Sequence, residues 1–192
     1  MQLPVYTNLK NGTKVKLDYM QHPYESVQVK KLLNTIVMEG KSYPQKQPLT
    51  DLEFDAYWLL GHAFVVKAIV PSNKSRSQEI VAAFYIKPNF SGRCSHICNA
   101  GFIVQPQMRG QGIGRFMGET MLLIAASLGY QAVMFNLVFE TNIPSIKLWE
   151  SLKFQTIGRI PAAVELENNS HIDALIMYRR LGIKSEERGI RS

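Results

Sequence analysis

The chain has 192 residues, of which 46% are hydrophobic and 19% are charged, and its formal net charge at pH 7 is +7. This balance is typical of a one-domain globular protein and excludes a mainly disordered chain. Two cysteines exclude a disulfide scaffold. With no apolar run of membrane length and no secretory signal, the sequence predicts a cytoplasmic protein and leaves the mitochondrion and the nucleus open.

Apolar periodicity and turn residues predict eleven elements in a single domain over 1–192. In chain order these are a strand at 14–20, helices at 24–39 and 50–60, strands at 63–70, 79–86 and 99–104, a helix at 112–128, a strand at 132–139, a helix at 142–153, and strands at 154–160 and 173–180. Thr50 and Glu53 form a capping-box pattern at the start of the second helix. The order predicts a mixed α/β sheet with a parallel pair around the helix at 112–128.

Three segments are expected to be irregular. A polar hairpin loop is predicted at 71–77 and a longer loop at 161–171, and residues 182–192 are predicted to form a flexible polar tail.

A glycine-rich turn, Arg109-Gly-Gln-Gly-Ile-Gly114, leads from a predicted strand into the helix at 112–128. The first amides of a helix lack partners and the helix dipole is positive there, so a phosphate binds well at such a place. Glycines allow close approach of the phosphate to the backbone, and Arg109 and Arg115 add positive charge. From the glycines alone, a turn that only packs against its neighbours explains the pattern as well.

Spacing excludes two common nucleotide motifs. The dinucleotide fingerprint requires G-x-G-x-x-G and an acidic residue about 20 positions later. Here the spacing is G-x-G-x-G, and the next predicted strand contains no acid before Glu140. The P-loop ends in Gly-Lys-Ser/Thr, whereas Gly114 is followed by Arg115 and Phe116.

The turn resembles the R/Q-x-x-G-x-G/A motif of the GCN5-related N-acetyltransferases, and the segment from Asn142 to Phe154 resembles their N-x-x-(A/S)-x-x-L-Y-x-x-x-G-F segment. The element order over 14–181 is similar to theirs. The resemblance implies a mostly antiparallel twisted sheet with about four helices and a parallel pair splayed at an acyl-CoA site. It also implies that Asn142 and Ser145 face the pantetheine and phosphate arm of acetyl-CoA. The residues then expected at the coenzyme are Arg109, Gly110, Gln111, Gly112, Ile113, Gly114, Arg115, Asn142, Ser145 and Trp149.

Trp149 departs from that pattern. Many members of the superfamily have a tyrosine at this position, proposed to protonate the leaving thiolate, and an indole has no acidic proton of useful pKa. A thiolate is a fair leaving group without an acid, since the pKa of a free thiol is about 8.5. The departure therefore weakens the prediction of an enzyme only slightly.

Two further segments resemble the fungal proline-analogue acetyltransferases, which N-acetylate azetidine-2-carboxylate. They are Arg-Cys-Ser-His-Ile-Cys-Asn-Ala-Gly-Phe-Ile-Val at 93–104 and Phe-Asn-Leu-Val-Phe-Glu-Thr-Asn at 135–142. The similarity covers about residues 35–180 and implies that Asn99 and Asn136 hold the substrate and take part in catalysis. It implies substrate contacts for Phe102 and Leu137. The expected acceptor is a small cyclic amino acid, such as L-azetidine-2-carboxylate or cis-4-hydroxyproline, and a homodimer is a possible assembly.

The same residues suit acyl transfer chemically. A thioester reacts when a neutral amine is held beside its carbonyl and a donor stabilises the oxyanion. The amides of Asn99 and Asn136 can hold the amine, and a strand-end N–H of Ile103 or Val104 can stabilise the oxyanion. An amide is no base at neutral pH. The proton acceptors left open are a water and the carboxylates of Glu140, Glu165, Glu167 and Asp173.

Other interpretations remain. By residue type alone, each asparagine could be a satisfied strand-end group, and Phe102 and Leu137 could be ordinary core. The same coenzyme loop could belong to an enzyme that acetylates a protein or a polyamine, although the surplus of lysine and arginine argues against a basic acceptor. It could also belong to a non-catalytic acyl-CoA-binding module.

No nucleic-acid, membrane or metal partner is expected. The chain lacks a basic strip interleaved with aromatic residues. Cys94, His96 and Cys98 alternate along an expected extended segment, but structural zinc sites have four ligands and no second cluster is present in the sequence. Neither cysteine has the sequence context of a reactive thiol.

Overall fold

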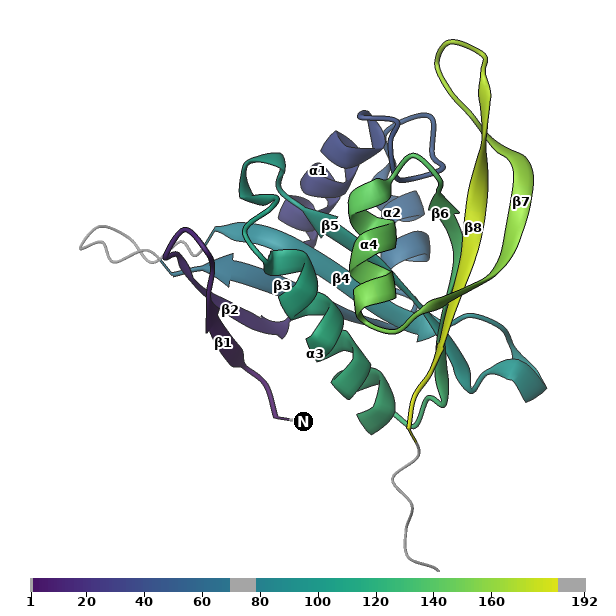
Figure 1. Ribbon diagram of the computed structural model, residues 1–192. Coiled ribbons are helices and arrows are strands. Elements are labelled where there is room, and N and C mark those ends of the chain that lie inside the picture. Colours follow the sequence, from purple (N-terminus) through teal and green to yellow (C-terminus); the bar gives the residue numbers. More distant parts are fainter. Residues whose placement is uncertain (1, 70–78, 183–192) are drawn as a thin grey trace, which may run out of the picture.

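In the residues that the structure describes, eight strands form one mixed sheet with helices on both faces (Figure 1). The computed structural model describes residues 2–69 and 79–182. The strand order across the sheet is β1-β2-β3-β4-β5-β6-β8-β7. The elements are β1 Val5–Asn8, β2 Lys14–Tyr19, α1 Ser26–Val37, α2 Asp51–Trp58, β3 His62–Ala68, β4 Ile80–Pro88, η1 Gly92–Cys94, β5 Ile97–Val104, η2 Pro106–Met108, α3 Ile113–Ser127, β6 Ala132–Phe139, α4 Ile143–Ser151, β7 Gln155–Glu165 and β8 His171–Arg180.

The strands β5 and β6 are the parallel pair that the sequence predicts, and α3 connects them. A parallel connection requires such a crossover, whereas the other neighbouring strands run antiparallel. The pair is short, because only Ile97 with Ala132 and Cys98 with Val133 are in register. Beyond these residues the two strands diverge. The mixed sheet, the four helices and the splayed parallel pair are therefore confirmed.

Each face of the sheet has its own core. Successive residues of a strand point to opposite faces, so Phe84 of β4 packs in the cluster with α3 and α4, while Tyr85 packs in the cluster with α1 and α2. Figure 1 shows these two helix pairs on opposite sides of the sheet. The divergence of β5 and β6 opens a gap in the sheet, which lies between these two cores.

The second helix begins as the sequence predicts. The Thr50 hydroxyl accepts a hydrogen bond from Glu53 N at 3.3 Å, and the Glu53 carboxylate accepts from Thr50 N at 2.8 Å. Leu49 and Phe54 are both buried in the core that α1 and α2 form with the sheet. The capping box is confirmed.

The expectations from sequence were wrong at both ends of the sheet. They missed β1, a four-residue edge strand paired with β2. They also placed a loop at 161–171, whereas β7 continues to Glu165 and only 166–170 form the turn to β8. Pro161 does not prevent this, because β7 is an edge strand and a missing N–H is tolerated there.

Two of the expected irregular segments fall mainly on residues that the structure does not describe: the loop at 71–77 lies outside the described ranges, and so does the tail beyond residue 182. No helix in the described ranges is long and apolar enough to cross a membrane.

Candidate active site

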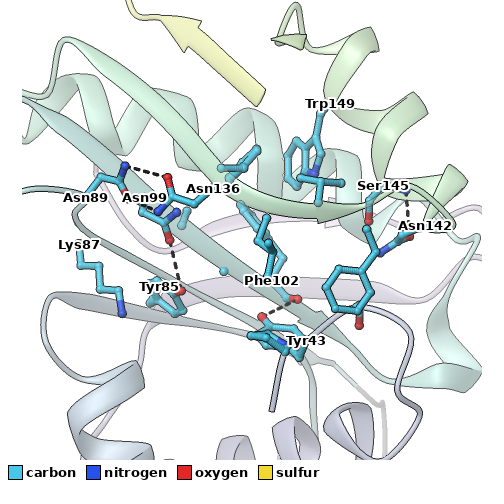
Figure 2. A pocket seen from close by; sticks show the side chains of 18 of the residues that line it. Tyr43, Tyr85, Lys87, Asn89, Asn99, Phe102, Asn136, Asn142, Ser145 and Trp149 are labelled. Carbon is cyan, nitrogen blue, oxygen red and sulfur yellow. Dashed lines mark hydrogen bonds between the residues drawn. The ribbon is translucent and has the colours of Figure 1, made fainter. Parts of the chain in front are cut away.

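A cavity of about 350 Å³ lies where β5 and β6 diverge (Figure 2). Asn89, Asn99 and Asn136 lie at one end of it with Lys87, while Asn142 and Ser145 lie at the other. All four predicted substrate residues line this cavity: Asn99, Phe102, Asn136 and Leu137. The gap in the sheet thus brings together residues that are up to 38 positions apart (99 to 137) in the chain.

Asn99 bridges the gap just past the last residue pair of β5 and β6. Its Nδ2 donates to the carbonyl of Met134 at 2.9 Å, and its Oδ1 accepts from the Tyr85 hydroxyl at 3.3 Å. A carbonyl oxygen only accepts hydrogen bonds, so the contact with Met134 O identifies the Asn99 atom there as Nδ2 and fixes the orientation of the amide. Burial raises the pKa of Tyr85 well above its usual range, which keeps the phenol protonated as a donor. The second lone pair of Asn99 Oδ1 remains available to a substrate amine.

Asn136 reaches the cavity because β6 bulges there. The pairing of β6 with β8 shifts register between Phe135 and Val138, and such bulges redirect side chains next to active sites. The amide of Asn136 exchanges two hydrogen bonds with Asn89, of 2.9 and 2.6 Å. Asn89 therefore holds Asn136 in place.

Trp149 and Phe102 form an apolar wall. The Trp149 ring centroid lies 4.9 Å from that of Phe102 and 4.5 Å from that of Phe135, and Phe102 stacks on Phe84 at 5.4 Å. Trp149 is 5% exposed. Phe102 is thus both core and cavity wall, and Leu137 likewise lines the cavity while packing against a small cluster of β6 to β8.

The two predicted oxyanion donors differ. Gln105 N donates to Val81 O on β4 at 2.9 Å. Because peptide groups alternate direction along a strand, Ile103 N also faces β4, and Val104 N faces the gap. The carbonyl of Phe102, which accepts from the Tyr43 hydroxyl at 3.1 Å, agrees with this alternation. Val104 can therefore donate to a ligand, while the Ile103 amide is committed to the sheet.

The glycine-rich turn offers free amides at the start of α3. Gly110 and Gly112 have φ values of 75° and 94°, a conformation that favours glycine. The first amide that donates within this segment is Phe116 N, to Gly112 O at 3.1 Å. Among the described residues, none accepts a hydrogen bond from the amides of 110–115. A row of unpartnered N–H groups at a helix start is the arrangement that binds phosphate.

The two arginines of the turn are already paired. Arg109 Nη2 lies 3.0 and 2.9 Å from the carboxylate oxygens of Glu39, in the turn that follows α1. Arg115 contacts Glu119 at 3.0 Å and the hydroxyl of Ser151 at 2.9 Å. The free charge expected beside the turn is therefore reduced, because acidic side chains pair with both arginines.

The carboxylates suggested as proton acceptors lie away from the cavity, whose lining contains no acidic residue among the described ones. Glu140 and Asp173 both bind Arg159, at 2.9 and 2.7 Å, and Glu165 pairs with Lys46. Hydrogen bonds from Arg159 and from Ala162 N lower the pKa of Asp173, and one from Lys46 lowers the pKa of Glu165. Carboxylates held in this way are poor bases, and none of the four suggested ones, Glu167 included, lines the cavity.

The cysteines do not form a metal site. Cys94 lies in η1 rather than on a strand, which corrects the expected alternation, and Cys98 is buried in β5. Within the described part of the chain no group of three or more His, Cys, Asp or Glu side chains could hold a metal ion.

Burial also raises the pKa of the Cys98 thiol to about 12, so this thiol is unreactive at neutral pH. We expect a thiol reagent such as DTNB to modify one cysteine, the exposed Cys94, in the native protein at pH 8. Both cysteines should react in denaturant. Rapid modification of two thiols in the folded protein would contradict the burial of Cys98.

The sequence model of the acetyltransferase (GNAT) family matches residues 33–154, more than half of the chain. The chain belongs to this family. The N-acetyltransferase aca1 of Schizosaccharomyces pombe is 50% identical over 98 residues, which are 50% of this chain and 47% of that protein. The chain thus matches less than half the length of this relative.

Solved structures agree on the GNAT fold. A GCN5-related N-acetyltransferase from Kribbella flavida superposes with a TM-score of 0.77 at 26% identity, over 87% of this chain and 98% of that one. A GNAT phosphinothricin acetyltransferase from Sinorhizobium meliloti, in complex with AcCoA, gives a TM-score of 0.75 at 16% identity, over 88% and 89%. At the latter identity the likeness concerns the fold alone.

The lining residues that the sequence did not predict include Tyr43, Tyr57, Tyr85, Lys87 and Asn89. Three of them lie in 83–104, a segment whose sequence is distinctive, and the alternation of Tyr85 with Lys87 opposite Asn99 could have revealed them. Gly101 is part of the same arrangement, because a Cβ there would lie 2.4 Å from the Tyr85 ring. Tyr43 lies between α1 and α2, where no sequence pattern connects it to the cavity.

Proposed function

We propose that this GNAT-family protein transfers the acetyl group of acetyl-CoA to the amine of a small amino acid. The observation that carries the proposal is the cavity between β5 and β6, which has asparagine amides at one end and leads to the start of α4 at the other. The free amides at 110–115 lie at the start of α3, the helix that joins the same two strands. Donor and acceptor sites therefore adjoin one gap in the sheet.

The coenzyme side rests on two helix starts. The unpartnered amides of 110–115 suit a pyrophosphate. At the other helix, Asn142 caps α4 by accepting from Ser145 N at 3.3 Å, and both residues line the cavity. The S. meliloti neighbour has the same fold and is in complex with AcCoA, which supports acetyl-CoA as the donor.

The acceptor side favours a small amine that is not a polyamine. Polyamines and basic peptides require acidic side chains to bind them, and the described lining of the cavity has none. Its walls are aromatic, and it is small. The resemblance of 93–104 and 135–142 to the fungal proline-analogue enzymes and the 50% identity to aca1 support a cyclic amino acid such as azetidine-2-carboxylate.

The reaction follows from these positions. The neutral amine, held at Asn99 and Asn136, attacks the thioester carbonyl, whose oxygen develops negative charge near Val104 N. The carbon–sulfur bond then breaks and the coenzyme leaves as a thiolate. The amine nitrogen loses one proton to water, and the thiolate can take one up. Catalysis by positioning and oxyanion stabilisation needs no acid at position 149.

The test is a screen of coenzyme thiol release. Azetidine-2-carboxylate, cis-4-hydroxyproline, proline, spermidine and a lysine peptide are each supplied with acetyl-CoA and purified protein. We expect release above background with the cyclic amino acids and little with spermidine or the peptide. If spermidine or the peptide were turned over faster than the cyclic amino acids, the proposed acceptor class would be wrong. Tight coenzyme binding without turnover on any amine would indicate the non-catalytic module.

Replacing Trp149 separates a structural from an acidic role. Trp149→Ala removes a buried indole from an aromatic cluster and should lower the free energy of unfolding by about 3–5 kcal/mol. Trp149→Phe keeps most of the packing and should retain kcat within about threefold, a free-energy change below about 1 kcal/mol. Urea unfolding and thiol-release rates measure the two effects. A large loss of kcat in a stable Trp149→Phe variant would show that the indole does more than pack.

A further inference from the structure

A lysine, Lys87, lies near the Tyr85 ring at the end of the cavity that holds Asn89, Asn99 and Asn136 (Figure 2). Lys87 Nζ lies 4.6 Å from the ring centroid of Tyr57 and 4.7 Å from that of Tyr85, and it donates to Tyr57 O at 2.9 Å. Aromatic faces attract cations. The rings therefore favour the charged ammonium, although partial burial lowers the pKa of Lys87.

This cation has no counter-ion in the described protein. No carboxylate of the described residues lies within ion-pair distance of Lys87, and no other described lining residue is charged. An ammonium has three donors, of which one is used by Tyr57 O. A partly buried charge without a partner is unfavourable. An anionic group in the cavity would therefore gain from this lysine.

The position relative to Asn99 defines the geometry of such a ligand. Lys87 and Asn99 are directly opposite on β4 and β5, and opposite residues point to the same face with Cα atoms about 5 Å apart. An α-amino acid has its amine and its carboxylate on one carbon. One small molecule can thus place its amine at Asn99 and its carboxylate at Lys87.

We propose that Lys87 binds the carboxylate of the acceptor and thereby selects amino acids over amines without an acid group. This proposal rests on the proposed function and adds the residue that determines the substrate class. The groups that face Lys87 are the ring and the backbone carbonyl of Tyr57 on α2 and the ring of Tyr85 on β4. Selection therefore depends on a single charge.

The ratio of activities on an acid and its amide tests this role. Azetidine-2-carboxylate and azetidine-2-carboxamide are compared with wild type, Lys87→Met and Lys87→Arg. For Lys87→Met, kcat/KM should fall about 10- to 100-fold on the acid, mainly through KM, and by less than about threefold on the amide. Lys87→Arg should retain more of the preference. Equal losses on both substrates, or no loss on the acid, would overturn the proposal.

A matched control and a pH profile distinguish an anchoring lysine from a structural one and from a catalytic base. Lys14, 5.7 Å from the Tyr6 ring and outside the cavity lining, makes a similar contact on the surface, so Lys14→Met should leave the acid-to-amide ratio unchanged. A lysine that anchors a carboxylate must be charged, so the preference for the acid should decline as pH rises through the lowered pKa of Lys87. Because the acceptor amine must itself be neutral to attack, its own titration lowers activity at low pH, so the acid-to-amide ratio of wild type is compared with that of Lys87→Met at each pH. A lysine that served as the base would act on both substrates alike, and a wild-type ratio that follows that of Lys87→Met at every pH would contradict the anchor.

Binding distinguishes this proposal from the proposed function. Calorimetry of both ligands with the coenzyme-A-bound protein should give at least about tenfold tighter binding of the acid in wild type and not in Lys87→Met. If the acid binds in this way but is not acetylated, the proposed function fails and the anchor stands. If the acid is acetylated but binds no better than the amide, the anchor fails and the proposed function stands.

Discussion

Asn99→Ala should lower kcat about 100-fold while changing the KM for acetyl-CoA by less than about threefold. In the proposed reaction Asn99 holds the amine, and it lies at the end of the cavity opposite Asn142 and Ser145. Its amide is fixed by Met134 and Tyr85, so the lone pair offered to the amine is already oriented. Steady-state thiol release at saturating acceptor and varied acetyl-CoA measures both constants.

Asn34→Ala is the matched control for that variant. Asn34 also joins two parts of the chain, by donating to Leu49 O at 3.0 Å and accepting from Leu49 N at 2.8 Å, but it lies outside the cavity lining. The Asn34→Ala protein should lose about as much stability as Asn99→Ala and keep the kcat of wild type. Near-normal turnover in a folded Asn99→Ala protein, or an equal loss of kcat in Asn34→Ala, would remove the catalytic role of Asn99.

Gly112→Ala should weaken acetyl-CoA binding about tenfold or more. Gly112 has a φ of 94°, which alanine adopts only with strain of about 1–3 kcal/mol, so the turn shifts and the amides of 110–115 lose their common direction. The acceptor site is separate, so kcat at saturating acetyl-CoA should change little. Equilibrium titration with coenzyme A measures the affinity.

Gly129→Ala provides the control on the same helix. Gly129 follows α3, has a φ of 86°, and a Cβ there would meet no other atom within 4 Å, as is also true of Gly112. The strain is similar, but the glycine-rich turn at 109–114 is unchanged. Gly129→Ala should lose stability and keep its affinity for the coenzyme. If both variants bound coenzyme A like wild type, the turn would not be the phosphate site.

Local signals in the sequence predicted much of the fold. The capping box at Thr50, the glycine that ends α3 and the alternation of the strands depend on neighbours in the chain. The edge elements were harder, because β1 is four residues long and β7 contains Pro161. Their strand character comes from pairing with β2 and β8, which a local pattern does not reveal.

Resemblance predicted Asn99 and Asn136, and the structure brings both to one cavity, but the sequence did not reveal the partners that hold them. The glycines predicted the turn at 109–114 as a phosphate site, and this role stays a prediction. The bulge that turns Asn136 comes from sheet register, which no local pattern reveals. The Glu39 carboxylate beside Arg109 and the Tyr57 ring beside Lys87 come from segments that are distant in the chain. The compartment and a homodimer stay predictions.

The most direct test of the central claim follows the acetyl group itself. The protein is incubated with acetyl-CoA labelled with ¹³C at the carbonyl and with azetidine-2-carboxylate, and the label is followed by NMR. We predict that the thioester signal is replaced by that of an N-acetyl amide on the amino acid, in step with the release of free coenzyme thiol. A thioester signal that persists, or label that appears only as free acetate, would contradict transfer to a small amino acid at this site.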